Sequence, residues 1–523
     1  MRKKHFLFAS VLALLCGSST LHAQDFKLTS SGYFKNQGVD VMAFDDIYPE
    51  GHQGGVCIIM NGHRVATNGD IRLEATPGQW QPVPKQLDRK LGDNSITATL
   101  CYPDSSRHLT GFNPMIYPDL HLIYTVNVES KGKNIEVTVD LDRPIPQEFI
   151  GKVGFNLEFF PGSLFGKPWI MDGQSGIFPQ QPNSPLMTTQ PNYLHTGNYH
   201  DGKKSLADMD KLIGKGYSPI VADDIISEPY AKGTKFTSRP DDPYNKVTIE
   251  SLSGDLQLFD GRMNHNNGWF VLRSNIKPGV TKGAVKWIIT PNVVADWMYQ
   301  PVIQTSQIGY HPTQDKEAVI EMDIRDNRKE TAQIIRIDAD GEKVVKNVTP
   351  ANWGKFLRYN YLKVDFTDVK EPGLYKIKYD TSVSPIFRID NDVYARGVWQ
   401  PVLEYFLPVQ MCHMRVNEKY RVWHDCCHMD DAQMAPAHNH IDGYDQKEGL
   451  SKFKPGEVVP GVNIGGWHDA GDFDLRIESQ AGESYILALA YEAFHPNLDV
   501  TSIDQINRVT EIHQPDGKND LLQ

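Results

Sequence analysis

Short apolar runs separated by turn residues fill the chain from about residue 25 to residue 390, and this spacing limits the possible folds more than any other feature. Residues 56–60 form one such run and are followed by Asn61-Gly62, a pair typical of tight hairpin turns. Residues 135–139 alternate apolar and polar side chains, the period of a strand with one buried face. We therefore expect residues 24–300 to fold as an all-β sandwich, whose role the sequence does not indicate.

A second β region, residues 303–390, has strands and turns at the spacing of an immunoglobulin-like sandwich. Three runs in this region have the composition of strands: residues 318–322, 332–337 and 374–379. Asp340-Gly341 is a turn signal between the second and third of these runs. We expect an immunoglobulin-like β-sandwich over this range.

The pattern becomes helical in the last part of the chain, residues 391–523. Residues 393–407 carry apolar side chains at helical spacing, and we expect Pro408 to end that helix. Residues 477–494 are expected to form a second helix, and its second half, from Tyr485 to Ala493, is nearly all apolar, which predicts burial on most sides. Residues 519–522 are expected to begin a third helix. Because so few buried helices do not make a self-sufficient helical domain, we expect the chain to be cut short inside its last domain.

Composition and net charge exclude several classes of protein. Hydrophobic residues make up 40% of the 523 positions and charged residues 23%, which excludes a disordered or collagen-like chain. Lys and Arg number 53 against 65 Asp and Glu, for a formal net charge of −12. A chain this acidic has no overall attraction for phosphate backbones, so we expect no nucleic acid partner.

Residues 1–23 have the features of a cleavable export signal. Basic residues at positions 2–4 precede an apolar run from Phe6 to Leu15, which is too short to span a bilayer. Ala23 supplies a small residue at the expected cleavage point. No later stretch is long and apolar enough for a transmembrane segment. We expect a secreted, periplasmic or cell-surface protein.

Five cysteines follow the expected cleavage point: Cys57, Cys101, Cys412, Cys426 and Cys427. The first two could form a disulfide or remain buried thiols. The last three lie near histidines in the sequence, and thiolate together with imidazole suits tetrahedral Zn²⁺. Their spacing is unlike that of a zinc finger, and a disulfide from Cys412 to Cys426 or Cys427 is the alternative in an exported protein.

The clearest candidate for chemistry is the segment from Gly465 to Asp472, which carries two carboxylates. Asp469 and Asp472 are separated only by Ala and Gly, so a ligand could approach the backbone between them. Two nearby carboxylates could hold and deprotonate a water molecule as general base. Spacing alone leaves two alternatives: Asp472 could cap the following helix, or the pair could ligate Ca²⁺.

Two groups of motifs resemble those of a known family. One group resembles the start of a family 9 glycoside hydrolase domain and comprises Gly465–Asp472, Cys412, residues 427–432 and residues 516–522. The other resembles the immunoglobulin-like module that often precedes that domain and comprises residues 307–312 and 318–320. The family consists mainly of cellulases with an (α/α)6 barrel. The resemblance implies that residues 391–523 are the first portion of such a barrel.

The resemblance also implies roles for individual residues. Asp472 matches the general base that activates water, and Asp469 matches the carboxylate that helps to hold that water. Members with the immunoglobulin-like module often bind a structural zinc ion, and its ligands match Cys412, Cys427, His428 and His468. This favours zinc over the disulfide. Calcium is possible in this family, but no residue here is assigned to it.

The implied activity is inverting hydrolysis of a β-1,4-glucan. In that mechanism a second carboxyl group, about 6.5–9.5 Å from the base, protonates the leaving oxygen. The family's acid is a glutamate near the far end of the barrel, and no position up to Gln523 matches it. We therefore expect an exported endoglucanase-like hydrolase that acts on β-glucan polysaccharides or oligosaccharides, and we expect this chain alone to be inactive. The alternative is a non-catalytic glycan-binding protein.

Overall fold

The computed structural model places most of the chain in two compact units, residues 1–299 and residues 300–523. It describes residues 25–45, 54–74, 76–77, 84–102, 120, 122–183, 227–263, 268–430, 432–434, 451–469, 475 and 477–523. The expected export signal, residues 1–23, therefore lies outside the described residues.

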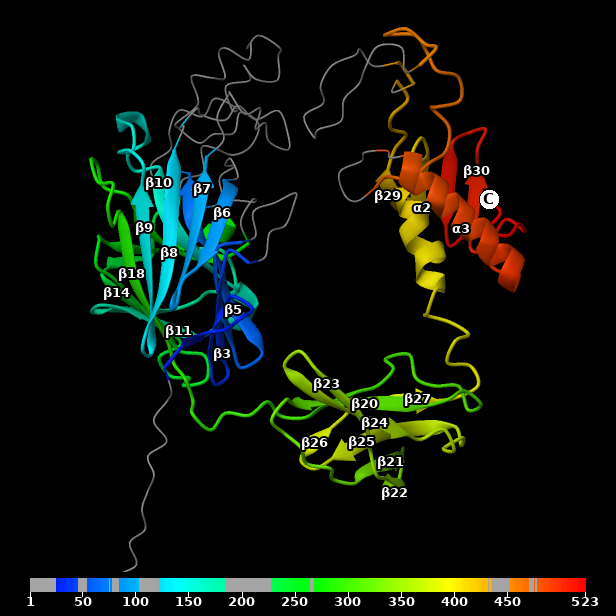
Figure 1. Ribbon diagram of the computed structural model, residues 1–523. Coiled ribbons are helices and arrows are strands. Elements are labelled where there is room, and N and C mark those ends of the chain that lie inside the picture. Colours follow the sequence, from blue (N-terminus) through cyan, green and yellow to red (C-terminus); the bar gives the residue numbers. More distant parts are fainter. Residues whose placement is uncertain are drawn as a thin grey trace, which may run out of the picture. The chain divides into compact units, whose positions relative to one another are not determined.

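The first unit contains two nine-stranded antiparallel sheets (Figure 1). In spatial order, one sheet comprises β1 (Lys27–Leu28), β2 (Phe34–Asn36), β3 (Val39–Ala43), β4 (Val56–Met60), β5 (His63–Leu73), β10 (Val153–Phe159), β17 (Phe270–Asn275), β16 (Leu256–Asp260) and β13 (Ala231–Gly233). The other comprises β12 (Gln174–Ile177), β11 (Pro168–Met171), β14 (Lys235–Ser238), β15 (Val247–Ser251), β18 (Val285–Pro291), β9 (Asn134–Leu141), β8 (Ile123–Lys131), β7 (Ser95–Cys101) and β6 (Lys85–Leu91). Single turns of 3₁₀ helix lie at Gln147–Phe149, Pro161–Ser163 and Gly261–Met263.

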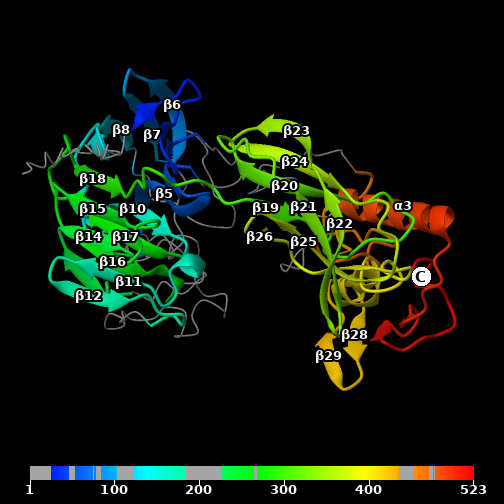
Figure 2. The same cartoon turned by 90° about the horizontal axis from the view of Figure 1, so that it is seen from below.

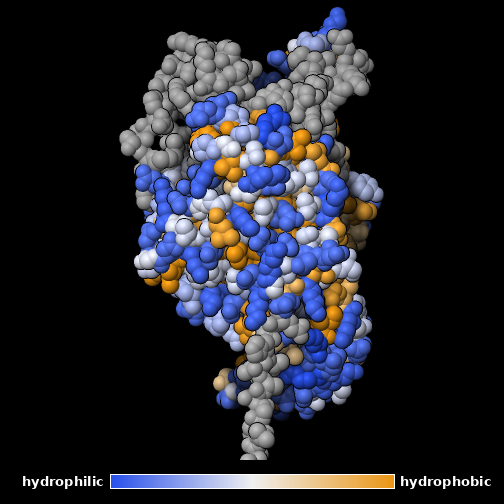
Figure 3. Space-filling view, turned by 60° about the vertical axis from the view of Figure 1, so that its left-hand side comes forward, coloured by the Kyte–Doolittle hydropathy of each residue, from blue (hydrophilic) through white to orange (hydrophobic). Residues whose placement is uncertain are grey.

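The core of this unit lies between the two sheets, where alternate strand residues point. In β8 and β9 every second side chain is buried, as their alternating sequences predict. Trp287 of β18 is fully buried and packs edge-on against Phe155 of β10, with ring centroids 4.9 Å apart. The predicted β-sandwich character is thus confirmed. On the face drawn in Figure 3, hydrophilic side chains predominate and hydrophobic ones are scattered among them.

Two sequence signals in this unit have clear structural outcomes. Asn61 and Gly62 join β4 to β5 and both have positive φ, 52° and 85°, as the expected tight hairpin turn requires. Cys57 and Cys101 are both buried and are thiols rather than a disulfide. Of the two states left open for this pair, the structure shows the thiols.

Residues 302–389 form a smaller sandwich of two antiparallel sheets, whose layers are visible in Figure 2. One sheet has the order β19 (Val302–Gln304), β20 (Glu317–Asp323), β24 (Tyr359–Asp365) and β23 (Ala351–Phe356). The other has the order β22 (Gly341–Val348), β21 (Ala332–Asp338), β25 (Gly373–Tyr379) and β26 (Ser382–Val383), with β27 (Phe387–Ile389) also paired to β25. Its core includes Ile320, Leu362, Ile377 and Phe387, one or more from each layer.

A buried lysine supports the loop that opens this sandwich. The Lys316 side chain is fully buried, and its ammonium group donates hydrogen bonds to the carbonyl oxygens of Pro312 (2.8 Å) and Gln314 (2.9 Å). Burial lowers the pKa of Lys316. The lysine therefore serves as an internal cross-link for residues 311–314.

Replacing Lys316 with Met should destabilise this sandwich, because it leaves buried carbonyl groups without their donor. We expect a loss of about 2 kcal/mol in the free energy of unfolding, measured by urea denaturation. Lys363→Met is the matched control, since Lys363 is partly exposed and pairs with Glu317 at 2.6 Å. The control should lose less than about 1 kcal/mol. Equal losses in the two variants would contradict this role for Lys316.

The last part of the chain contains little helix among the described residues. A helical segment begins with a π-helical stretch at Val402–Phe406 and continues as α2 (Leu407–Gln410). The expectation that Pro408 ends this helix was wrong, because the helix continues past Pro408 to Gln410. The start was also too early, since residues 391–399 are turns and bends.

The second predicted helix is present at the expected bounds as α3 (Ile477–Phe494). Its predicted burial was wrong for the described chain: Ile477, Tyr485 and Phe494 are 83%, 66% and 81% exposed. Residues 520–522 form a turn rather than a helix. No helix of the described residues is long and apolar enough to cross a membrane. The described residues do not show the helical barrel that the resemblance implies.

A small sheet in this region was not predicted from the sequence. Its order is β29 (Arg421–His424), β28 (Arg415–Glu418), β31 (Val509–Ile512) and β30 (Thr501–Asp504), and β28 and β31 are parallel. Its buried side chains form a separate cluster of Met414, Val416, Ile503 and Ile512. The sheet holds the segments on either side of β28 and β29 in place, and these segments carry the candidate site.

Candidate metal centre and the adjacent loop

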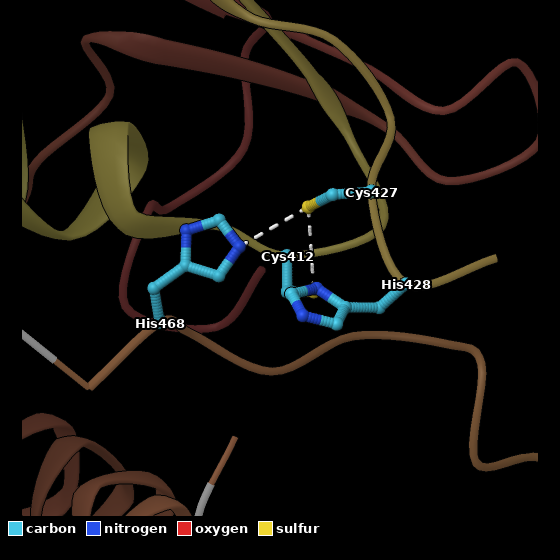
Figure 4. Close-up of side chains that lie close together, drawn as sticks. All are labelled: Cys412, Cys427, His428 and His468. Atoms are coloured by element: carbon cyan, nitrogen blue, oxygen red, sulfur yellow. Dashed lines mark hydrogen bonds between the residues drawn. The ribbon is translucent and has the colours of Figure 1, made fainter. Parts of the chain in front are cut away.

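Four side chains from three separate segments of the chain meet at one point (Figure 4). One donor atom from each of the four lies within 4.8 Å of the others: Cys412, Cys427, His428 and His468. The two sulfur atoms are 3.6 Å apart. His428 Nδ1 lies 3.1 Å from the sulfur of Cys412, and His468 Nε2 lies 3.1 Å from the sulfur of Cys427.

This donor set fits a tetrahedral zinc ion. With Zn–S bonds of 2.3 Å, two sulfur ligands of a tetrahedron lie about 3.8 Å apart, close to the separation here. Two thiolates and two imidazoles are a common set for structural zinc sites. Cys412 and His468 are buried, which limits access by water, and Cys427 and His428 are partly buried. A resident zinc ion would hold these four side chains together.

Backbone pairing brings the segments together. Cys412 follows α2, and its N–H donates to the carbonyl of Gly466 (2.9 Å). The N–H of His468 donates to the carbonyl of Gln410 (2.7 Å), so the two segments run antiparallel over a short distance. The remaining pair, Cys427 and His428, follows the end of β29. Two cysteines and two histidines are therefore placed by one short bridge and one hairpin.

The disulfide alternative does not agree with this geometry. The 3.6 Å separation of the Cys412 and Cys427 sulfurs is far longer than a disulfide bond of about 2.05 Å. Cys426 is exposed and is a thiol. Its sulfur is directed toward the carbonyl of Arg508 at 3.9 Å rather than into the group of four donors.

His413 and His424 also lie close to these cysteines in the sequence, but their ring nitrogens contact backbone carbonyl oxygens. His413 contacts the carbonyl oxygens of Gly465 through Nδ1 (2.8 Å) and His428 through Nε2 (3.1 Å). His424 contacts those of Asp425 (2.9 Å) and Val409 (3.0 Å). The two histidines therefore surround the candidate metal centre without belonging to it.

Of the two predicted catalytic aspartates, the structure describes only Asp469. Asp469 is exposed and directly follows His468. Asp472 lies outside the described residues. Gly465 and Gly466 have φ of +72° and +90°, so the turn before Asp469 uses a backbone conformation that favours glycine. Asp469 is thus adjacent in the chain to a candidate metal ligand.

Two further side chains, Gln480 and Arg508, hold the backbone of this loop and were not predicted from the sequence. The Gln480 side chain at the start of α3 donates to the carbonyl of Trp467 at 3.1 Å. Arg508, between β30 and β31, donates to the carbonyl oxygens of Asn463 (3.1 Å) and His413 (3.4 Å). A single polar residue that is far along the chain from its partner forms no sequence motif, so only the folded structure identifies these contacts.

The ionisation of His468 makes this site sensitive to pH. Burial, followed by the nearby His424, His428 and His413 rings, lowers the pKa of His468 from 6.5 to about 4. The neutral imidazole that results near pH 7 is the form that binds metal.

We expect the second unit to lose stability as the pH falls from 6.5 to 4. An unfolded histidine binds its proton below about pH 6.5, whereas the folded His468 does so only near pH 4. The unfolded state therefore binds more protons in this interval, and the free energy of unfolding decreases as the pH is lowered. Denaturation at several pH values measures this. The His468→Gln variant should show a smaller decrease, and an identical decrease would contradict the assignment.

Comparison with known proteins identifies one segment. The family described as the cellulase N-terminal ig-like domain matches residues 298–384. This segment is similar to the immunoglobulin-like domain found at the N-terminus of cellulases. The match confirms the relationship that residues 307–312 indicated, and the sandwich of residues 302–389 is the fold of this domain.

Solved structures similar to this chain include family 9 glycoside hydrolases. A zinc-binding triple mutant of the family 9 endoglucanase J30 is 24% identical, with a TM-score of 0.26, over 35% of this chain and 31% of that one. A family 9 protein of Bacteroides ovatus is 20% identical, with a TM-score of 0.29, over 42% of this chain and 36% of that one. The matches span about a third of each solved protein. TM-scores this low do not establish that the chain shares the fold of these proteins. No curated protein matches the chain.

Proposed function

We propose that this chain is the N-terminal part of an exported β-1,4-glucan hydrolase of the endoglucanase type. The observation that carries the proposal is the cellulase-type immunoglobulin-like domain at residues 298–384. A group of two cysteines and two histidines next to Asp469 follows that domain in the chain and agrees with the proposal. The basic and apolar pattern of residues 1–23 supports export.

The proposed chemistry is hydrolysis with inversion at the anomeric carbon. Asp472 acts as the general base, which removes a proton from water as the water attacks the sugar. Asp469 accepts a hydrogen bond from the same water and orients it. A carboxylic acid beyond Gln523 protonates the leaving oxygen.

In this proposal Cys412, Cys427, His428 and His468 hold a zinc ion. The ion supplies structural cross-linking, because all four of its positions are filled by protein atoms. His468 is bonded to Asp469 in the chain, so fixing the imidazole also fixes where the loop with the two aspartates begins.

Helix α3 supports the proposal that the catalytic domain is a larger helical barrel. The helix carries Ile477, Tyr485, Ile486 and Phe494 at exposures from 59% to 83%. A helix that is apolar all round is normally buried among other elements. Further helices of an (α/α)6 barrel would cover these side chains.

The proposal is tested by assaying hydrolysis of carboxymethyl-cellulose. A polypeptide that continues beyond Gln523 through the rest of the barrel should release reducing ends, and NMR of the first products should show the inverted anomer. The 523-residue chain should release none, because it lacks the acid. Hydrolysis by the 523-residue chain at the same rate would contradict the assignment of the acid to the missing portion.

A second candidate function, glycan binding, is supported by aromatic residues on the outer face of the immunoglobulin-like domain. Trp353 and Phe356 of β23 are each 57% exposed. Tyr361 of β24 lies beside Trp353, with ring centroids 5.6 Å apart, and Tyr359 of β24 is paired with Phe356. The hydroxyl of Tyr361 donates to Glu321 (3.1 Å), which places a carboxylate next to the rings. Exposed aromatic rings flanked by polar groups suit the C–H faces and hydroxyls of pyranose sugars.

Isothermal titration calorimetry with soluble cello-oligosaccharides separates this function from hydrolysis. Glycan binding predicts heat of binding that disappears in the Trp353→Ala variant and remains in the Ile308→Ala variant, since Ile308 is exposed elsewhere in the same domain. Absence of binding to the unmodified chain would rule out this second function and leave the hydrolase proposal intact.

A further inference from the structure

His413 connects the candidate metal centre to the loop that carries Asp469. Its side chain is almost completely buried, with 1% exposure. One ring nitrogen, Nδ1, lies 2.8 Å from the carbonyl oxygen of Gly465, and the other, Nε2, lies 3.1 Å from that of His428. His413 is outside the group of four donors, so its ring is available for these two contacts.

The two carbonyl groups belong to segments with different roles. Gly465 is at the start of the turn that leads to His468 and Asp469. His428 is a candidate metal ligand through its own ring. The His413 ring therefore spans from the backbone of a ligand to the backbone of the loop, and both contacts are between protein atoms.

The backbone of His413 indicates that this arrangement is specifically held. Its φ is +62°, a left-handed conformation that is uncommon for a residue with a side chain. Its carbonyl oxygen accepts a hydrogen bond from Arg508 (3.4 Å), and the same guanidinium nitrogen donates to Asn463 (3.1 Å), just before the turn. The surrounding structure thus compensates for an unfavourable backbone conformation, which orients the ring between the two carbonyls.

We propose that His413 is a positioning residue that fixes the Gly465 turn, and with it the start of the Asp469 loop, relative to the metal-binding segment. A metal ion would hold the His468 ring but would leave the direction of the Gly465 carbonyl undetermined. The imidazole of His413 determines that direction. The significance of this for catalysis rests on the proposed function of Asp469 and Asp472.

Two conservative variants separate the two contacts. The amide nitrogen of asparagine can occupy the place of Nδ1, and that of glutamine can occupy the place of Nε2. His413→Asn should therefore keep the contact with Gly465 and lose the one with His428, whereas His413→Gln should do the reverse. His413→Phe keeps a ring but removes both contacts.

The experiment is amide hydrogen exchange on the full 523-residue chain loaded with zinc. The reporters are the amides of Cys412 and His468, whose bonds to Gly466 and Gln410 join the two segments. In His413→Phe and His413→Gln these amides should exchange roughly tenfold faster, the change expected when one hydrogen bond of ordinary strength is lost. In His413→Asn they should exchange close to the unmodified rate.

His513→Asn is the control, since His513 is a partly exposed histidine of the same unit whose ring pairs with Glu418. It should leave both reporter amides unchanged. Equal exchange in the Asn and Gln variants, or unchanged exchange in all three His413 variants, would overturn the proposal. The readout requires no glucan hydrolysis, so failure of the proposed function and failure of this inference are distinguishable.

Discussion

Replacing Cys427 with Ala is expected to unfold the segments around the candidate metal centre while leaving the two sandwiches folded. The substitution removes one of four donors that lie within 4.8 Å of one another, and three ligands hold zinc less tightly than four. Structural zinc sites contribute on the order of 10 kcal/mol to the folding of small zinc domains. The neighbouring hydrophobic cluster has only four buried members, so it offers little to replace that contribution.

Limited proteolysis followed by mass spectrometry measures this effect. New cleavage should occur within residues 411–428 and 463–469 and not within the strands of the two sandwiches. Cys426→Ala is the matched control, because Cys426 is the adjacent cysteine in the chain but is exposed and outside the donor group. If the two cysteine variants are cleaved alike, the four side chains do not form the structural site described here.

Replacing Asp472 with Asn is expected to abolish hydrolysis by a polypeptide that includes the proposed remainder of the helical barrel. Removal of a general base typically lowers the rate by about 10²–10⁴-fold. An amide has nearly the same shape as the carboxylate but cannot accept the proton, so kcat should fall while the affinity for glucan changes little. The measurement is the rate of reducing-end release from carboxymethyl-cellulose over a range of substrate concentrations.

Two further variants are the controls for Asp472. Asp469→Asn should lower kcat by less than Asp472→Asn, because an asparagine oxygen can still accept a hydrogen bond from the water. Asp425→Asn changes an exposed aspartate near the metal segment and should leave kcat unchanged. A residual rate in Asp472→Asn equal to that of the unmodified enzyme would show that another group is the base.

The sequence predicted the β regions well because their signals are local. The alternation of apolar and polar side chains in residues 135–139 favours a strand, and β9 includes these residues. The Asn61-Gly62 pair favours a tight turn, and both residues have the positive φ of such a turn. The bounds of α3 were also predictable, since its apolar residues recur at helical spacing. The exposure of its apolar side chains was not predictable, because burial depends on which other helices or strands pack against the helix, and a local sequence pattern does not specify them.

The site was predictable from residue types but not from spacing alone. Cysteine and histidine near each other in the sequence indicated a metal, yet spacing left seven possible donors, with a disulfide as the alternative. The folded chain selects four of them. The short bridge between Met411 and Trp467 brings His468 to Cys412, and the hairpin of β28 and β29 brings Cys427 and His428 to the same point. The same alignment turns His413 and His424 toward backbone carbonyls, an outcome that the sequence does not contain.

X-ray absorption at the zinc edge, on the purified 523-residue chain, tests the central claim most directly. We predict one zinc ion per chain, with two sulfur neighbours near about 2.3 Å and two nitrogen neighbours near about 2.0–2.1 Å. This result would place Cys412, Cys427, His428 and His468 around one ion beside the Asp469 loop. A chain that retains no metal, or a zinc ion surrounded only by nitrogen and oxygen, would contradict the account.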